Sequence, residues 1–244
     1  MASYDLGLFK GHGLGDVGAV GNGFQEHERV STLADKIAKH LTGKGLKVHT
    51  GVNNYVNVYV NSNTYGKKFA LSLHLNSASD SSASGCEILV PLKEKYFDME
   101  VEILKGLEGL GYKNRGLKSR DYNTEAWSKR TNGIASSGKD YYKEIRTAWE
   151  KGVSLSIVEF CFISNSADIQ RFNNNIDKIA LLVANAILRM LKMDLIPEPT
   201  TTAPQTNVLY RVMCGSFSSK ANAEKRVEEL KAKGFDSTIM TFQK

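Results

Sequence analysis

The stretch Ser154-Leu155-Ser156-Ile157-Val158-Glu159-Phe160-Cys161-Phe162 has the near-continuous apolar character of a strand buried on both faces of a sheet. One ionisable side chain, that of Glu159, interrupts this run. An unpaired carboxylate in such surroundings costs free energy unless it has a partner or a shifted pKa. The stretch therefore predicts a buried strand and a carboxylate with a special role. The alternative is that Glu159 points outward and pairs with a lysine or arginine.

Strand-like and helix-like patterns alternate through the first 195 residues. The predicted strands are Tyr4–Phe9, Leu46–Thr50, Lys68–Asn76, Cys86–Val90 and Ser154–Phe162. The predicted helices are 26–42, 93–110, Asp140–Lys151 and Ile176–Met193. This alternation predicts an α/β fold, with a mostly parallel twisted sheet flanked by helices on both faces. Residues 121–139 show no period, and we expect a surface loop that lines a groove.

A proline- and threonine-rich segment divides the chain. Ile196–Thr206 holds three of the four prolines, a composition that favours an extended linker. We therefore predict a domain over 1–195, a linker over 196–206 and a second unit over 207–244. The pattern in the second unit indicates a short β-α-β arrangement.

The overall composition is that of a globular protein with a moderate positive charge. The chain has 244 residues, a net charge of +6 and a sequence pI near 9.1, with lysines and arginines scattered along it. Such an excess favours polyanions through long-range steering, so nucleic acid and an anionic cell wall are both candidates, beside a charge that serves solubility alone. The three cysteines follow no disulfide or zinc spacing. Without a signal peptide or an apolar span, we expect synthesis in the cytoplasm and no membrane span.

Four ionisable residues lie at the predicted ends of strands or the start of a helix: His12, Glu26, His74 and Glu159. In open α/β sheets, sites form where strands end, so these residues can meet. Two histidines and a glutamate are a usual ligand set for a catalytic zinc with one open position. The alternatives are a core histidine at His74 and a phosphate cradle at Gly11–Gly15, although the latter lacks the GxGxxG pattern.

Three segments, in this order, resemble those of the zinc-dependent N-acetylmuramoyl-L-alanine amidases, the Amidase_3 family. They are Gly11-His12-Gly13 with Gly21–Glu26, then Leu71–Ser77, then Val158–Asn165. The resemblance covers residues 4 to about 193. It implies that His12, Glu26 and His74 bind Zn²⁺ and that Glu159 is the catalytic carboxylate, a role that suits a desolvated acid.

The resemblance leaves some assignments open. Glu28 lies close to Glu26 with His27 between them, so the choice of ligand within Gln25–Glu28 stays open, and His27, His40 and His49 are expected to be ordinary surface or packing residues. The segment Asp121–Lys151 is longer than its counterpart in the family, so the groove is expected to differ there.

The second unit resembles the start of a SPOR domain, a module that binds peptidoglycan. The segment that carries the resemblance is Tyr210–Glu224, followed by a helix and Gly234-Phe235. A whole domain of this kind is longer, so we expect the unit to be truncated or completed by association.

Together the resemblances predict a peptidoglycan hydrolase that cleaves the amide bond between N-acetylmuramic acid and L-alanine. The expected partner is bacterial peptidoglycan rather than nucleic acid, and the oligomeric state is left open. A phage endolysin and a mother-cell autolysin both fit, each acting at the cell wall after release. The alternatives are a zinc carboxypeptidase acting on stem peptides and a non-catalytic wall-binding protein.

Overall fold

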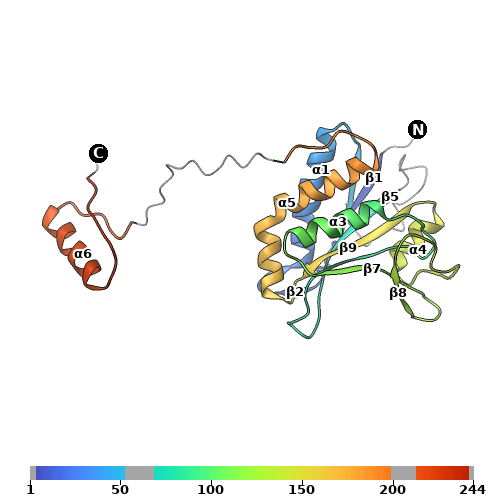
Figure 1. Ribbon diagram of the computed structural model, residues 1–244, viewed down its shortest axis with the longest axis horizontal. Coiled ribbons are helices and arrows are strands. Elements are labelled where there is room, and N and C mark those ends of the chain that lie inside the picture. The colour runs from blue at the N-terminus through green and yellow to red at the C-terminus, as the bar shows by residue number, and fades with distance from the viewer. Residues whose placement is uncertain (1–3, 53–68, 199–212, 242–244) are drawn as a thin grey trace. The chain divides into compact units, whose positions relative to one another are not determined.

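The computed structural model describes residues 4–52, 69–198 and 213–241. The chain divides into two compact units, Met1–Glu198 and Pro199–Lys244 (Figure 1). The predicted linker, Ile196–Thr206, lies outside the described residues except for 196–198.

A seven-stranded sheet forms the centre of the first unit, in the order β4-β1-β5-β9-β6-β7-β8. The strands are β4 (Val48–Val52), β1 (Leu6–Lys10), β5 (Phe69–Asn76), β9 (Ser154–Phe162), β6 (Cys86–Leu89), β7 (Asn114–Arg120) and β8 (Trp127–Arg130). Four of the six neighbouring pairs are parallel; β9–β6 and β7–β8 are antiparallel. The prediction of a mostly parallel sheet is confirmed. A small hairpin of β2 (Val20–Gly21) and β3 (Phe24–Gln25) leads into the first helix.

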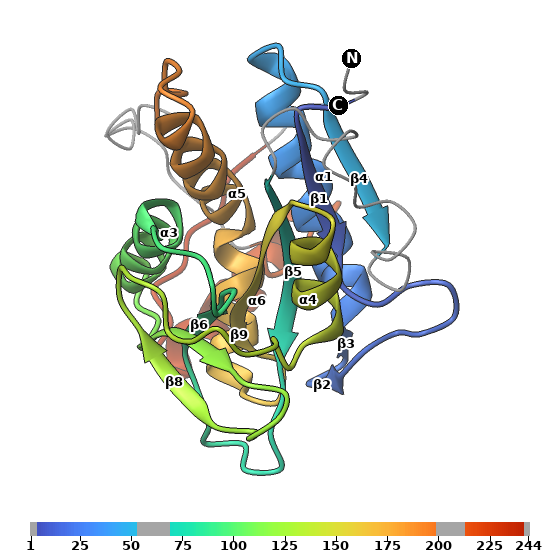
Figure 2. The same cartoon turned by 90° about the vertical axis from the view of Figure 1, so that its right-hand side faces the viewer.

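Helices cover both faces of the sheet, as predicted. On one face, α1 (Glu26–Gly43), α3 (Asp98–Gly109) and α5 (Ser166–Met190) enclose the larger apolar core. On the other face, α4 (Lys143–Glu150) packs Ile145 and Ala148 into a smaller core that includes Leu155 and Ile157 of β9. Figure 2 shows α4 on the face of the sheet opposite to α1 and α5. Alternate residues of β9 enter the two cores, which explains its continuous apolar pattern.

Several element predictions need correction. Strand β7 was not predicted, and α3 begins at Asp98 rather than at residue 93. Helix α5 begins at Ser166, ten residues before the predicted start at Ile176, because the Asn165 side chain accepts a hydrogen bond from the backbone N–H of Asp168 (3.1 Å) and caps the helix. The segment predicted as a loop contains strand β8, which pairs with β7 at the edge of the sheet. Edge strands have one unpaired side and need not be apolar, so β8 gives no hydrophobic signal.

The second unit contains helix α6 (Lys220–Ala232), none of whose residues is buried. Among residues 213–241 there is no other helix and no strand, so the described part lacks the strands of the predicted β-α-β unit. The first of these strands was expected from Tyr210, which lies outside the described residues. A strand needs a partner to satisfy its backbone, and the described part of this unit offers none. No helix in the described parts of either unit is long and apolar enough to cross a membrane.

Candidate metal centre

The four predicted residues meet at one end of the central strands. His12 follows β1, Glu26 is the first residue of α1, and His74 lies near the end of β5. Glu159 of β9 is in direct register with His74 on the neighbouring strand. The site therefore joins segments that are far apart in the sequence, as the carboxyl-end rule predicts.

Glu26 is the centre of the cluster. One of its oxygens, Oε2, lies 3.1 Å from His12 Nε2, and the other, Oε1, lies 2.9 Å from His74 Nδ1. The backbone N–H groups of Ala19 and Leu75 each donate to this carboxylate at 3.0 Å. Burial opposes the charge, but the hydrogen bonds with His12 and His74, helped by the charge of His74 and the N–H of Ala19, hold the pKa of Glu26 well below its usual range. The result is a buried, oriented anion between two imidazoles.

The Glu26 carboxylate raises the pKa values of the two histidines, whereas its own pKa is lowered. The hydrogen bond to Glu26 raises the pKa of His12 above its ordinary value, against the effect of burial. Burial would lower the pKa of His74, but the hydrogen bond to Glu26 and the nearby charges of Glu144 and Glu159 raise it to about 9. The pocket around these rings thus attracts positive charge, and a metal cation can supply it in place of protons.

The donor set fits a metal ion. His12, Glu26 and His74 each offer one ligand atom, and these three atoms lie within 4.8 Å of one another. Two imidazole nitrogens and one carboxylate oxygen are the ligands of many catalytic metal sites that keep a position for water. Further carboxylates stand behind the rings: Asp16 Oδ2 lies 2.9 Å from His12 Nδ1, and Glu144 Oε1 lies 3.8 Å from His74 Nε2. Carboxylates in this position orient metal-binding histidines.

The backbone around the cluster leaves no room for extra side-chain atoms. His12 itself has a φ of 62°, and Gly18 has a φ of 69°. A Cβ atom on Gly18 would lie 2.5 Å from His12 Cδ2 and 2.8 Å from Glu26 Oε2. A Cβ atom on Gly11 would lie 2.8 Å from the His74 ring. Gly11, which belongs to the first motif, and Gly18 are therefore needed for close approach to the two rings.

Glu159 is buried beside the cluster. Its Oε2 atom has no hydrogen-bond partner in the part of the chain that the structure describes. Burial raises the pKa of Glu159 to about 7, with a smaller opposing effect from His74. A carboxyl group with this pKa can accept and return a proton near neutral pH. The register places Glu87 of β6 on its other side, and Glu87 is paired with Arg115 and Lys118, each at 2.6 Å.

The other histidines and Glu28 have contacts that explain them without the cluster. His27 Nδ1 lies 2.6 Å from the carbonyl oxygen of Gly11, and Glu28 pairs with Arg29. His49 stacks on Tyr4 with ring centroids 4.8 Å apart, and burial lowers the pKa of His40. Of the acidic residues at the start of α1, Glu26 is the one that faces the two rings.

Glu144 is a residue of the cluster that the sequence did not indicate. It lies in the first turn of α4, and its Oε2 atom is buried with no hydrogen-bond partner among the described residues. Nothing in a short polar helix distinguishes this glutamate from Glu150 of the same helix. Only the packing of α4 against β9 brings it to His74.

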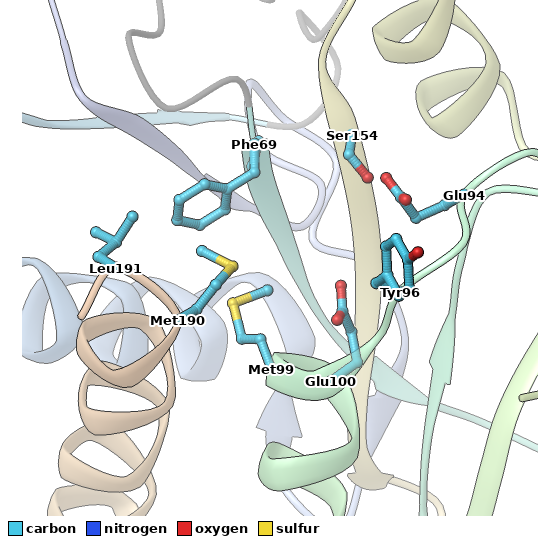
Figure 3. Close-up of a pocket in the computed structure, with 9 residues that line it drawn as sticks. Phe69, Glu94, Tyr96, Met99, Glu100, Ser154, Met190 and Leu191 are labelled. Atoms are coloured by element: carbon cyan, nitrogen blue, oxygen red, sulfur yellow. The ribbon is translucent and has the colours of Figure 1, made fainter. Parts of the chain in front are cut away.

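A separate cavity of about 340 Å³ lies away from this cluster (Figure 3). Phe69 and Ser154, which line it, are the first residues of β5 and β9, so the cavity lies at the opposite end of these strands. Glu100 and Met99 of α3 also line it, and no histidine does.

Comparison with known proteins agrees with these features. The family described as N-acetylmuramoyl-L-alanine amidase matches residues 7–189, and the SPOR domain matches residues 206–244. A sporulation-specific N-acetylmuramoyl-L-alanine amidase of Bacillus subtilis (strain 168) is 24% identical over 242 residues, which cover 94% of this chain and 82% of that protein.

Solved structures share the fold. Cwp6 from Clostridium difficile has a TM-score of 0.58 and 23% identity, covering 77% of this chain and 29% of that one. A structure described as the putative N-acetylmuramoyl-L-alanine amidase from Neisseria meningitidis has a TM-score of 0.56 and 22% identity, covering 80% of this chain and 100% of that one.

Proposed function

The chain belongs to the N-acetylmuramoyl-L-alanine amidase family, and from this premise we propose that it uses zinc to hydrolyse the bond between N-acetylmuramic acid and L-alanine in peptidoglycan. The observation that carries the proposal is the convergence of His12, Glu26 and His74 beside a buried Glu159. Their donor set suits Zn²⁺, and a carboxylate next to it is what amide hydrolysis requires.

Zn²⁺ held by His12, Glu26 and His74 would lower the pKa of a bound water and polarise the scissile carbonyl. Glu159 takes the proton of the attacking water as a new carbon–oxygen bond forms. It then returns this proton to the alanine nitrogen as the carbon–nitrogen bond breaks. Its raised pKa, about 7, suits both steps because the same group must act as base and then as acid.

Asp16 and Glu144 act through the histidines. Asp16 accepts from His12 Nδ1 at 2.9 Å and also from the backbone N–H of Gly18, so it fixes the ring that follows β1. Glu144 faces the far nitrogen of His74. Each contact keeps a ring nitrogen directed towards the centre of the cluster.

The proposed organisation is a catalytic domain over 1–195, a linker over 196–206 and a peptidoglycan-binding unit over 207–244. The match of the SPOR domain to residues 206–244 supports the last assignment. The exposed apolar side chains of Met213, Phe217 and Phe235 give this unit a surface for contact with a partner. We infer that the protein acts at the bacterial cell wall.

The test is hydrolysis of purified Gram-positive cell walls, with identification of the new amino termini. We expect alanine-ended peptides whose release stops with a chelator and resumes with zinc. Glu159→Gln should reduce the rate at least about 100-fold while the chain stays folded and keeps its zinc. Release of a carboxyl-terminal amino acid would indicate a carboxypeptidase. Wall binding without new termini would indicate a non-catalytic protein.

A further inference from the structure

We propose that the exposed face of β7 and β8 binds the stem peptide of the substrate by contacting the carboxylates of that peptide. We call this surface the β7–β8 face and define it by Lys118, Arg120, Trp127 and Lys129. The inference rests on the proposed function, since it names the part of peptidoglycan that the site selects.

The register of the sheet makes this face continuous with Glu159. Residues in register on neighbouring strands point to the same side of a sheet. Glu159 is in register with Glu87, and two residues further along β6, Leu89 is in register with Lys118. Lys118 in turn is opposite Lys129 on β8. A direct contact supports the placement of Lys118 on the same side of the sheet as Glu87, because Lys118 Nζ lies 2.6 Å from Glu87 Oε2.

The next pair along the same face adds an aromatic surface. Arg120 is opposite Trp127, and its guanidinium carbon lies 5.3 Å from the centre of the indole ring. The Trp127 side chain is 50% exposed, and Tyr142 at the start of α4 lies 6.3 Å from it between ring centroids. A half-exposed indole bordered by cations is suited to bind a ligand that has both apolar and anionic parts.

Positive charge is concentrated in this part of the chain. Residues 113–146 contain nine lysines and arginines and four aspartates and glutamates, a net charge of +5 within a chain whose total is +6. The sequence suggested a scattered excess, but the net charge of this part of the chain falls on β7 and β8. Lys129 is exposed and has no ion pair among the described residues. It is therefore available to an anionic ligand.

The length of the face fits a stem peptide. Three strand spacings separate β9 from β8, a distance of about 14 Å. An extended peptide of four or five residues, bound with its first amide at Glu159, spans about 13–17 Å. The stem peptide carries free carboxylates, whereas the lactyl carboxyl group of the glycan is consumed in the scissile amide bond. Charge complementarity thus assigns the face to the stem rather than to the sugars.

The test compares two soluble muropeptides that differ only in their stem carboxylates, free in one and amidated in the other. Wild-type enzyme should prefer the free form. Lys129→Glu should lower kcat/KM for this form about tenfold through KM, and should change hydrolysis of the amidated form little. Lys105→Glu is the matched control, since Lys105 is an exposed lysine of α3, on the other face of the sheet.

Several outcomes would overturn the inference. An equal loss on both muropeptides, or the same loss in Lys105→Glu, would show that the stem carboxylates do not bind here. In another outcome, Lys129→Glu hydrolyses both muropeptides at the normal rate but binds cell walls less, with a loss that grows with the phosphate content of the wall. This result would assign the face to a phosphate polymer. If wild-type enzyme releases no alanine-ended peptide from muropeptides or walls, the proposed function itself fails. If the rate of muropeptide cleavage depends neither on the stem carboxylates nor on Lys129, only the present inference is refuted and the proposed function stands.

Discussion

Replacing Gly18 with alanine should inactivate the site while leaving the fold in place. The φ of 69° at Gly18 is left-handed, so a side chain there costs about 1–2 kcal/mol of stability. The added Cβ would lie 2.5 Å from His12 Cδ2. Since ordinary carbon–carbon contacts begin near 3.5 Å, the ring must move by about 1 Å. A displacement of this size in a catalytic group costs about 100-fold in rate.

Gly23→Ala is the control for this experiment. Gly23 has a φ of 81°, and a Cβ atom there would meet nothing within 4 Å. Both variants should therefore share the backbone cost, about 2–8 °C in Tm, and any further loss in Gly18→Ala comes from the overlap with His12 and Glu26. Only Gly18→Ala should lose zinc affinity and kcat/KM for release of alanine-ended peptides. Equal activities in the two variants, at equal zinc loading, would refute the view that Gly18 sets the position of His12.

Two other changes test the surroundings of the cluster and the distant cavity. Glu144→Gln should lower zinc affinity about tenfold in competition with a chelator, whereas Glu150→Gln on the same helix should not; equal affinities would show that Glu144 does not orient His74. Glu100→Gln should raise Tm at pH 8, because burial raises the pKa of Glu100 despite the hydrogen bond from Ser156 (2.8 Å). A carboxyl group with a raised folded pKa contributes stability below its unfolded pKa and loses it as pH rises through the folded pKa. The gain in Tm should therefore shrink near pH 4, and a gain that is independent of pH would contradict this cause.

The buried strand and the four central residues could be read from the sequence because each has a local signal. Strand β9 was predicted with its bounds, Ser154–Phe162, since both of its faces enter apolar cores. His12 lies between glycines, and Glu159 is a charge within an apolar run. These signals identify the candidates, and the experiments above test their roles.

Features set by tertiary packing could not be predicted in this way. Strand β8 has one tryptophan followed by three consecutive polar residues, so it resembles a loop in the sequence. Glu144 enters the site only because Ile145 and Ala148 anchor α4 on the sheet. The concentration of charge on the β7–β8 face depends on the pairing of two strands, which places Lys118 opposite Lys129.

The position of β9 within the sheet has a consequence for biosynthesis. This strand is the last of the seven in the chain, yet it lies between β5 and β6. A nascent chain that ends before Ser154 therefore has the edges of β5 and β6 unpaired, as two half-sheets, and lacks Glu159 altogether. Such a chain is liable to aggregate through those edges. The sheet, and the cluster at the ends of its central strands, can therefore be completed only after β9 has left the ribosome.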